Sequence, residues 1–276
     1  MKKNWINGKT FIITGASGGI GFAVSKILIE NYDCTVIGVA RNKEKTLKAK
    51  ESLGEKKDKF IEYFFDVSSL DSWKSFKDFL EENNFSVDGL INNAGFMLPF
   101  SKFTDYKIDE IDEIVKTNFM SILYSIKTLK PLLDKSSTPT IVNVSSSAGL
   151  CAVVGQSMYC ATKFAVRGFT DTIRQDFGKK YNVLGVYPGF IRTDILSRQK
   201  TNDKENKLIN KMMMPLSKAS KKIVKNIRKR KKNTVMGFDG HGLSIMGRFF
   251  PNVAPSLVKT VLKASGLELF EGVFKE

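Results

Sequence analysis

Short apolar runs alternate with longer helical segments from Lys9 onward, and this alternation constrains the fold more than any other feature of the chain. Runs that are apolar throughout are typical of parallel strands covered by helices on both faces. The strands are expected at 11–13, 35–39, 60–65, 89–91, 141–145, 183–187 and 234–238, and the helices at 20–31, 43–53, 69–83, 108–133, 156–177 and 218–232. The sequence therefore predicts an α/β fold with one doubly wound sheet of about seven parallel strands and helices on both faces. No linker or repeat divides the chain, so we expect a single domain over residues 1–276.

A glycine-rich turn, Thr14-Gly15-Ala16-Ser17-Gly18-Gly19-Ile20-Gly21, lies between the first expected strand and the first expected helix. Glycines at this place allow the backbone to approach a pyrophosphate, whose charge the helix N-terminus attracts. Twenty residues after Gly21, an acidic residue would bind a ribose 2′-hydroxyl, but this chain has Arg41, which suits a 2′-phosphate. The turn therefore predicts a dinucleotide site, with NADP(H) favoured and NAD(H) still possible. The alternatives are a plain loop and a solvated arginine.

A tyrosine and a lysine share one face of the helix expected at 156–177. Tyr159 and Lys163 are four residues apart, which places them one helical turn from each other. A lysine beside a tyrosine favours the phenolate, so we expect the pKa of Tyr159 to be lowered from its ordinary value and the side chain to serve as a general acid or base. Ser146 follows the apolar run 141–144 and would hold a carbonyl oxygen at the sheet edge. Its neighbours Ser145 and Ser147 complicate this assignment, and a tyrosine four residues before a lysine also occurs by chance.

Taken together and in this order, the motifs resemble the short-chain dehydrogenase/reductase family, classical type, across residues 9–193 and more loosely to Phe238. The resemblance implies a Rossmann-type fold and reversible hydride transfer between a nicotinamide and a carbonyl or secondary alcohol, as in the oxidoreductases of class EC 1.1.1. It also implies a homo-oligomer, either a dimer or a tetramer. The cofactor contacts implied are Thr14, Gly15, Ser17, Gly19, Ile20, Gly21, Asp66, Val67, Asn92, Ala94, Gly95, Tyr159, Lys163, Pro188, Gly189 and Thr193, to which Arg41 is added from its position.

The family's catalytic tetrad would fall on Asn118, Ser146, Tyr159 and Lys163. By resemblance, Lys163 would also bind the nicotinamide ribose, and Asn118 would anchor a water that links Lys163 to solvent. An alternative function is a catalytically silent NADP(H)-binding sensor or scaffold of the same fold. Such a protein would usually have a broken tetrad, whereas all four positions are filled here.

The substrate side of the site is expected to be apolar. Its wall would be formed by Phe96, Met97, Leu98, Leu150, Val153, Val154 and Phe190, with residues 195–215 as a mobile lid. This composition favours a lipophilic carbonyl or alcohol, such as a steroid or bile acid, a retinoid-like molecule or a ketoacyl chain. The alternative is that these side chains only pack against the lid.

The charge of the chain is strongly positive, with 44 Lys and Arg against 28 Asp and Glu. Nine of the fifteen residues from Lys218 to Lys232 are basic, but Ile223, Val224 and Ile227 form an apolar stripe, so this helix is expected to cover the sheet. Aromatic interleaving and known nucleic-acid motifs are missing from it, so no nucleic-acid partner is predicted.

The segment 239–276 reads as an amphipathic extension in which apolar residues alternate with Arg248, Lys259 and Lys263. We expect it to cap the substrate cleft, to pack on the body or a partner subunit, or to touch a membrane surface. The three scattered cysteines and the lack of an export signal favour a cytoplasmic protein, possible membrane contact aside. The single histidine, His241, has no second ligand nearby, so neither a metal site nor a hydrolase triad is predicted.

Overall fold

One all-parallel sheet of seven strands forms the centre of the protein in a computed structural model that describes residues 4–193, 195, 205 and 213–274. The strands lie in the order β3-β2-β1-β4-β5-β6-β7. Their bounds are β1 Thr10–Thr14, β2 Thr35–Ala40, β3 Phe60–Phe64, β4 Gly89–Asn92, β5 Thr140–Val144, β6 Asn182–Pro188 and β7 Asn233–Met236. The order reverses between β1 and β4, and the carboxyl ends of strands at such a switch point form the usual ligand crevice of this fold class. The predicted doubly wound sheet is confirmed.

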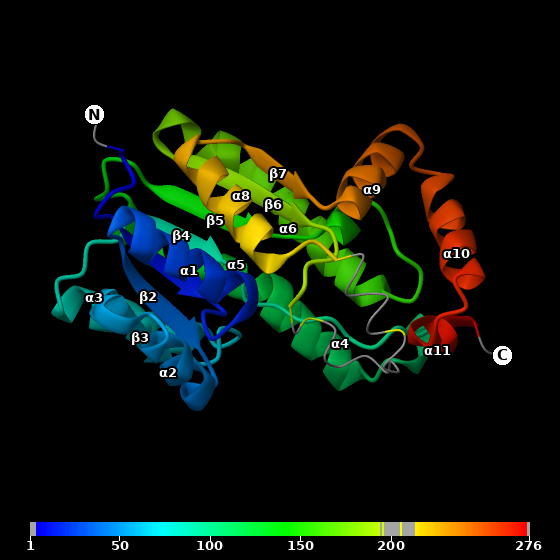
Figure 1. The fold of residues 1–276 in the computed structure, drawn as a ribbon, viewed down its shortest axis with the longest axis horizontal. Helices are drawn as coiled ribbons and strands as arrows, with labels where there is room; N and C mark the ends of the chain where they lie inside the picture. The colour runs from blue at the N-terminus through cyan, green and yellow to red at the C-terminus, as the bar shows by residue number, and fades with distance from the viewer. Residues whose placement is uncertain (1–3, 194, 196–204, 206–212, 275–276) are drawn as a thin grey trace.

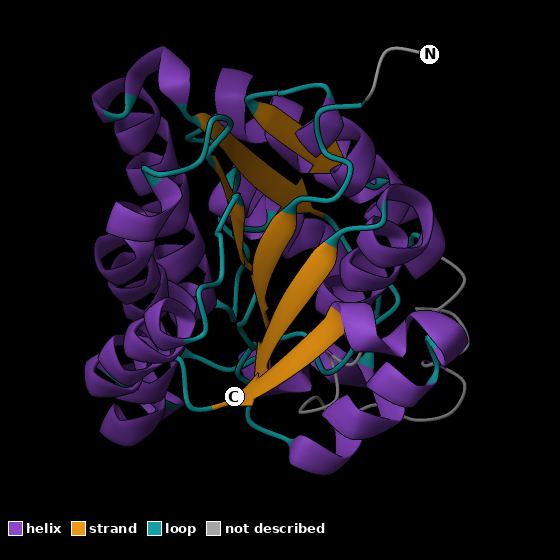
Figure 2. Cartoon of the chain, turned by 90° about the vertical axis from the view of Figure 1, so that its left-hand side faces the viewer, coloured by secondary structure: helices purple, strands orange, loops and turns teal. Residues whose placement is uncertain are grey.

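Helices cover both faces of the sheet (Figure 2). On one face α1 (Gly19–Tyr32) and α8 (Leu216–Arg228) bury their apolar sides, and on the other face α3 (Leu70–Glu82), α5 (Ser121–Leu133) and α6 (Ser157–Asp176) do so. The shorter α2 (Lys43–Glu51) follows β2, and α4 (Ile108–Val115) precedes α5. The basic helix α8 buries Ile223, Val224 and Ile227 completely or almost completely, as its stripe predicted.

The helix expected at 108–133 contains a break in its hydrogen-bond pattern. Between α4 and α5 the residues Lys116–Met120 form one π-helical turn, so that the chain continues as a helix but gains an extra residue in this turn. Such turns are rare in proteins, and those that occur are often found at functional sites. Asn118 lies inside this turn and is fully buried.

The C-terminal extension forms three helices, α9 (Phe238–Phe249), α10 (Ala254–Ala264) and α11 (Glu271–Phe274). Figure 1 shows α9 and α10, in orange and red, beyond the end of β7, with α10 standing away from the sheet. The chain then returns to the body, where Leu269, Phe270 and Val273 pack with Met97 and Phe100 from the segment after β4. None of the helices in the described part of the chain is both long and apolar enough to cross a bilayer.

Candidate active site

The glycine turn joins β1 to α1 with its backbone unusually close to neighbouring segments. Gly15 and Gly19 have positive φ values of 67° and 51°, a conformation that favours glycine. A Cβ added at Gly21 would collide with the Gly15 carbonyl oxygen. The turn thus forms a concave stretch of backbone at the N-terminus of α1, which is the shape that a pyrophosphate requires.

Two side chains hold this turn against the end of β4. The Thr14 hydroxyl accepts hydrogen bonds from the Asn93 and Ala94 N–H groups at 2.9 and 3.0 Å, and the Asn93 side-chain amide donates to the Thr14 carbonyl at 3.0 Å. Asn92 points elsewhere: its amide bonds Asn143 at 2.9 Å and accepts from Ser125 at 2.7 Å, all in a buried network. Thr14 and Asn92 therefore support the crevice from behind, and Asn93 is a supporting residue that the sequence analysis did not single out.

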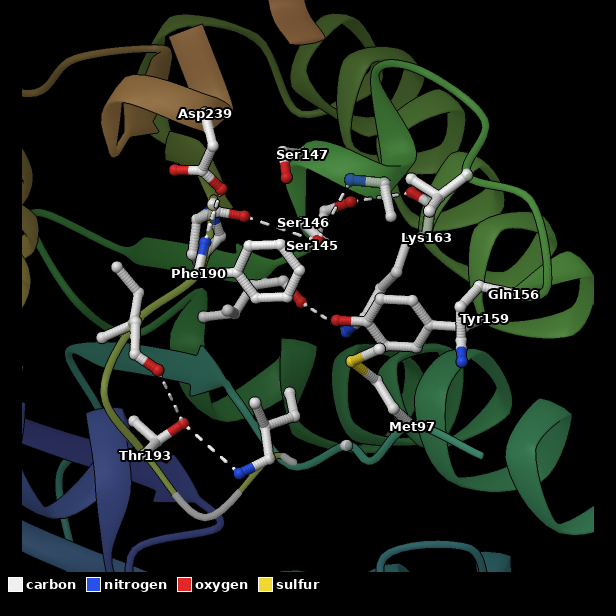
Figure 3. Close-up of a pocket in the computed structure, with 18 of the residues that line it drawn as sticks. Met97, Ser145, Ser146, Ser147, Gln156, Tyr159, Lys163, Phe190, Thr193 and Asp239 are labelled. Carbon is white, nitrogen blue, oxygen red and sulfur yellow. Dashed lines mark hydrogen bonds between the residues drawn. The ribbon is translucent and has the colours of Figure 1, made fainter. Parts of the chain in front are cut away.

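Tyr159, Lys163 and Ser146 converge at the carboxyl end of β5 (Figure 3). The Lys163 Nζ donates to the Val144 carbonyl at 3.1 Å and lies 5.5 Å from the centroid of the Tyr159 ring. The Ser146 hydroxyl accepts from the Ala148 N–H at 3.1 Å and donates to the Pro188 carbonyl at 3.4 Å. These contacts connect the end of β5 with the end of β6 and bring three of the predicted tetrad residues together.

The three consecutive serines differ in what their hydroxyl groups do. The Ser145 hydroxyl donates to the backbone carbonyl of Lys163 at 2.7 Å, which ties α6 to β5. A hydrogen bond between Ser146 and the Tyr159 hydroxyl acts on the pKa of that tyrosine. Ser147 also lines the cavity, so the alternating direction of side chains along a strand does not exclude it from the site. The structure therefore favours Ser146 as the serine that acts with Tyr159.

Asn118, the fourth residue of the predicted tetrad, supports the crevice without lining it. Its side-chain oxygen accepts from the Phe96 N–H at 3.0 Å, and its side-chain nitrogen donates to the Phe96 carbonyl at 2.9 Å. A Cβ added at Gly95 would lie 3.0 Å from the Asn118 oxygen and 3.4 Å from the Lys163 Nζ. Gly95 therefore leaves room for both polar groups, and the π-helical turn places the asparagine beside the loop after β4.

Burial shifts the pKa of both titratable groups of the site. It raises the pKa of Tyr159 to about 12, against the lowering effect of the hydrogen bond with Ser146. It lowers the pKa of Lys163 to about 8. The sequence predicted a lowered tyrosine pKa, and this prediction is wrong for the structure, because the loss of hydration in the buried site outweighs favourable neighbours.

A cavity of about 760 Å³ is lined by the glycine turn together with Ser146, Tyr159 and Lys163. The predicted residues that line it are Gly15, Ser17, Gly19, Ile20, Ala94, Gly95, Ser146, Tyr159, Lys163, Pro188, Gly189 and Thr193. The predicted residues that do not are Thr14, Gly21, Asn92 and Asn118, which lie behind the lining, together with Arg41, Asp66 and Val67 near the ends of β2 and β3.

Beyond the cavity lining, the ends of β2 and β3 present a charged pair. The Arg41 guanidinium lies 3.3 Å from the Asp66 carboxylate, and both side chains are partly exposed. Burial alone would raise the pKa of Asp66, but hydrogen bonds from the Ser68 N–H and hydroxyl, together with Arg41, lower it below its ordinary value. The carboxylate is thus held ionised and Arg41 is held at the position where the sequence predicted a phosphate contact.

Lys45 is a second basic residue at this place, and the sequence analysis did not identify it. It lies in the first turn of α2, where its backbone N–H bonds the Asn42 side chain at 2.8 Å. A Cβ added at Gly18 would lie 3.1 Å from the Lys45 Cε and 3.4 Å from its Nζ. The ammonium group therefore lies over the glycine turn, and its position four residues after Arg41 is the signal that could have revealed it.

The apolar wall of the cavity comes only partly from the residues that were predicted. Phe96, Met97, Val153 and Phe190 line the cavity, whereas Leu98, Leu150 and Val154 do not. Leu98 is buried in a cluster behind the wall, and Val154 lines a separate hollow. A large further part of the wall comes from α9, α10 and the segment after α10, through Leu243, Met246, Leu257, Val258, Val261, Leu262 and Phe270.

Most of the predicted lid at 195–215 lies outside the described residues, although Ile195 lines the cavity. Asp239, in the first turn of α9, is a further residue that sequence reasoning missed. Its carboxylate accepts from the Phe190 N–H at 2.7 Å and lies directly against Gly189 (Figure 3). It therefore attaches the C-terminal helices to the segment that borders the cavity after β6.

A model of the short chain dehydrogenase family matches residues 9–204. This chain belongs to the short-chain dehydrogenase family. The match covers the glycine turn, the tetrad positions and the segment after β6. The protein is an oxidoreductase of this family, and α8 to α11 lie beyond the matched region.

Curated relatives are about 30% identical to this chain over the aligned residues. An uncharacterized oxidoreductase of Staphylococcus saprophyticus is 32% identical over 70% of this chain and 78% of its own length. The NADP-dependent 3-hydroxy acid dehydrogenase of Schizosaccharomyces pombe is 30% identical over 68% of this chain and 74% of its own length.

Solved short-chain dehydrogenase structures share the fold at lower identity. A family member from Burkholderia phymatum in complex with NAD has a TM-score of 0.75 at 19% identity, covering 84% of this chain and 89% of that one. An alcohol dehydrogenase from Thermococcus sibiricus, complexed with 5-hydroxy-NADP, has a TM-score of 0.73 at 20% identity, covering 83% of this chain and 96% of that one. These likenesses support the Rossmann-type architecture.

Proposed function

We propose that this protein transfers a hydride between NADP(H) and an uncharged lipophilic carbonyl compound or secondary alcohol. The observation that carries the proposal is that Ser146, Tyr159 and Lys163 meet in the same cavity as the glycine turn. The turn fits a dinucleotide, because its glycines have no side chains to fill the space that the pyrophosphate would occupy beside the backbone. When bound, the nicotinamide would supply or accept the hydride.

The protein's own residues would hold the substrate oxygen and move its proton. In the reducing direction, the Ser146 hydroxyl would hydrogen-bond the carbonyl oxygen and the Tyr159 hydroxyl would donate a proton to it. The raised pKa of Tyr159 keeps the phenol protonated near neutral pH, which is the form that this step requires. Lys163 keeps most of its positive charge below its pKa of about 8 and would stabilise the phenolate left after proton transfer.

Arg41 and Lys45 support a preference for NADP(H). Arg41 lies at the end of β2, where a 2′-phosphate would replace a ribose hydroxyl, and Lys45 lies over the glycine turn. A phosphate between them would meet two cations, whereas a free ribose hydroxyl would not benefit from either charge. The preference is the same as that named for the Schizosaccharomyces pombe relative.

The lining of the cavity supports an uncharged substrate. Of the described residues that line it, only Lys45, Lys163 and Asp239 carry a formal charge. The first lies over the glycine turn, the second lies beneath Tyr159, and the third is bound to the Phe190 N–H. No described cation is therefore left to pair with a substrate carboxylate, so we propose a steroid-like, retinoid-like or ketoacyl compound instead of a hydroxy acid.

The test follows the absorbance of reduced nicotinamide while the purified protein meets lipophilic ketones, their alcohols and short hydroxy acids, with NADP(H) and NAD(H) in parallel. We expect turnover with the lipophilic compounds and NADP(H), and none with the matched variant Tyr159→Phe. Turnover confined to hydroxy acids would overturn the proposed substrate class. Tight NADP(H) binding without any turnover would instead favour the silent sensor.

A further inference from the structure

A series of exposed apolar side chains lies on α9, α10 and the segment between them. Along each helix its members lie four residues apart, which places them on one face of that helix. Each of them is between 50% and 65% exposed, and together we call them the C-terminal apolar face: Ile245, Phe249, Phe250, Val253, Leu257 and Val261. Several large exposed apolar side chains on one short segment suggest an interaction site.

Basic side chains accompany this face. Between Phe238 and Ala264 the chain carries Arg248, Lys259 and Lys263, and its single acidic residue, Asp239, is turned inward to the Phe190 N–H. The Arg248 guanidinium lies 5.5 Å from the Phe249 ring centroid. Aromatic and basic groups side by side suit an anionic interface.

Lys259 and Lys263 also border a hollow of about 370 Å³ on the side of α10 away from the main cavity. Lys102 and the exposed ring of Phe103 complete this basic rim, and none of the described residues that line the hollow is acidic. The basic rim therefore lies on the side of α10 opposite Leu257 and Val261, so this helix has an apolar side and a basic side, as interfacial helices have. A phosphate group at this surface would find lysines from two segments of the chain.

The C-terminal apolar face is continuous with the proposed active site. Leu257 and Val261 line the main cavity although half or more of each side chain is exposed, and Val258 and Leu262 line it from the same helix. The helix α10 is thus both the wall of the cavity and part of the molecular surface, as its position at the edge of the molecule shows in Figure 1. A lipophilic ligand that contacts Leu257 and Val261 from outside is therefore already at the edge of the cavity.

We propose that the C-terminal apolar face docks on the surface of an anionic phospholipid bilayer and that lipophilic substrate enters the cavity from that bilayer. Docking on the bilayer does not depend on catalysis by this protein, whereas delivery of substrate to the cavity rests on the proposed function. With 11 residues, α10 is too short to span a bilayer and would lie in the interface. The test below distinguishes this occupant from a second copy of the chain on the same face.

The docking test measures co-sedimentation of the full chain with vesicles of phosphatidylcholine, alone or mixed with phosphatidylglycerol. We expect binding to the mixed vesicles that weakens with salt. The double variants Phe249→Ser/Val253→Ser and Lys259→Glu/Lys263→Glu should each reduce partitioning about tenfold or more, since one lysine near an anionic surface contributes about fivefold. Thermal melts would check that these exposed substitutions leave the fold intact.

Matched controls separate a local surface from the overall positive charge. The variant Lys229→Glu/Lys231→Glu changes the net charge equally at the exposed end of α8, and Ile108→Ser removes an exposed apolar side chain from α4. Both should change partitioning less than about twofold.

Three results would overturn the docking proposal: no binding to mixed vesicles at low salt, an equal loss in the α8 control, or face variants that dissociate an oligomer while vesicle binding is unchanged. Because docking is read without turnover, an inactive protein that still binds would refute only the proposed function. Delivery is tested by turnover of one substrate in vesicles and in detergent solution. The face variants should lose only the vesicle-borne rate, and equal losses in both would refute delivery.

Discussion

Replacing Lys163 by methionine should stabilise the protein near neutral pH while it removes a residue of the proposed tetrad. Burial lowers the pKa of this lysine from its ordinary value of 10.5 to about 8. At about 1.4 kcal/mol per pH unit, keeping the buried group charged at neutral pH costs on the order of 3 kcal/mol of folding free energy. Loss of the hydrogen bond to the Val144 carbonyl offsets about 1 kcal/mol of this. We therefore expect a net gain of about 2 kcal/mol, or about 4–8 °C in Tm.

The sign of the effect with pH is specific to this mechanism. Since the folded-state pKa is lower than the unfolded-state pKa, the unfolded chain holds a proton that the folded protein has lost between about pH 8 and 10.5. Stability of the natural protein should rise with pH through this window. The advantage of Lys163→Met should accordingly be greatest below pH 8 and shrink above it, and near pH 10.5 only the cost of the lost hydrogen bond to the Val144 carbonyl should remain.

Thermal melts followed by circular dichroism from pH 6 to pH 10 would measure this, with Lys48→Met, an exposed lysine on α2, as the matched control. The control should leave the Tm difference near zero at every pH. A stabilisation by Lys163→Met that is the same at pH 7 and pH 10 would refute the argument, because it would come from packing and not from the buried charge. A destabilised variant would mean that the contacts of the ammonium outweigh its desolvation.

Further substitutions test the remaining parts of the site. Tyr159→Phe should lower kcat about 10²- to 10⁴-fold while the cofactor Kd, measured by fluorescence titration, stays unchanged, since only a proton donor is removed; a matching rise in Kd would point to a binding role. Arg41→Asp should raise the KM for NADPH about 10- to 100-fold with little change for NADH, and an unchanged KM ratio would assign the phosphate to another residue. Asp239→Ala should free the Phe190 N–H and raise KM about tenfold, with partial rescue in Asp239→Asn; equal kinetics in all three proteins would dismiss the contact. Gly21→Ala should abolish cofactor binding, because its Cβ would collide with a backbone carbonyl of the turn, and calorimetry showing normal affinity would contradict this.

Much of the architecture could be predicted from the sequence, because buried parallel strands have continuous apolar sequences and glycine is required where backbones approach closely. The helix that carries Tyr159 and Lys163 was predicted with these residues one turn apart, since helical periodicity is a local property. The π-helical turn at Asn118 was not predicted. Its asparagine bonds the backbone of Phe96 in the loop after β4, and no local pattern of residues reveals such a contact.

The amino-acid sequence by itself determined the alternation of strands and helices, the nucleotide turn and the residue types available for proton transfer. Tertiary structure decided what surrounds them. Only the fold buries Tyr159 and Lys163 enough to raise one pKa and lower the other, because desolvation depends on neighbours from distant segments. Only the fold places Lys45 over the glycine turn and Asp239 against the segment after β6. It also makes α10 a wall of the cavity, since contacts between residues far apart in the chain leave no periodic trace in the sequence.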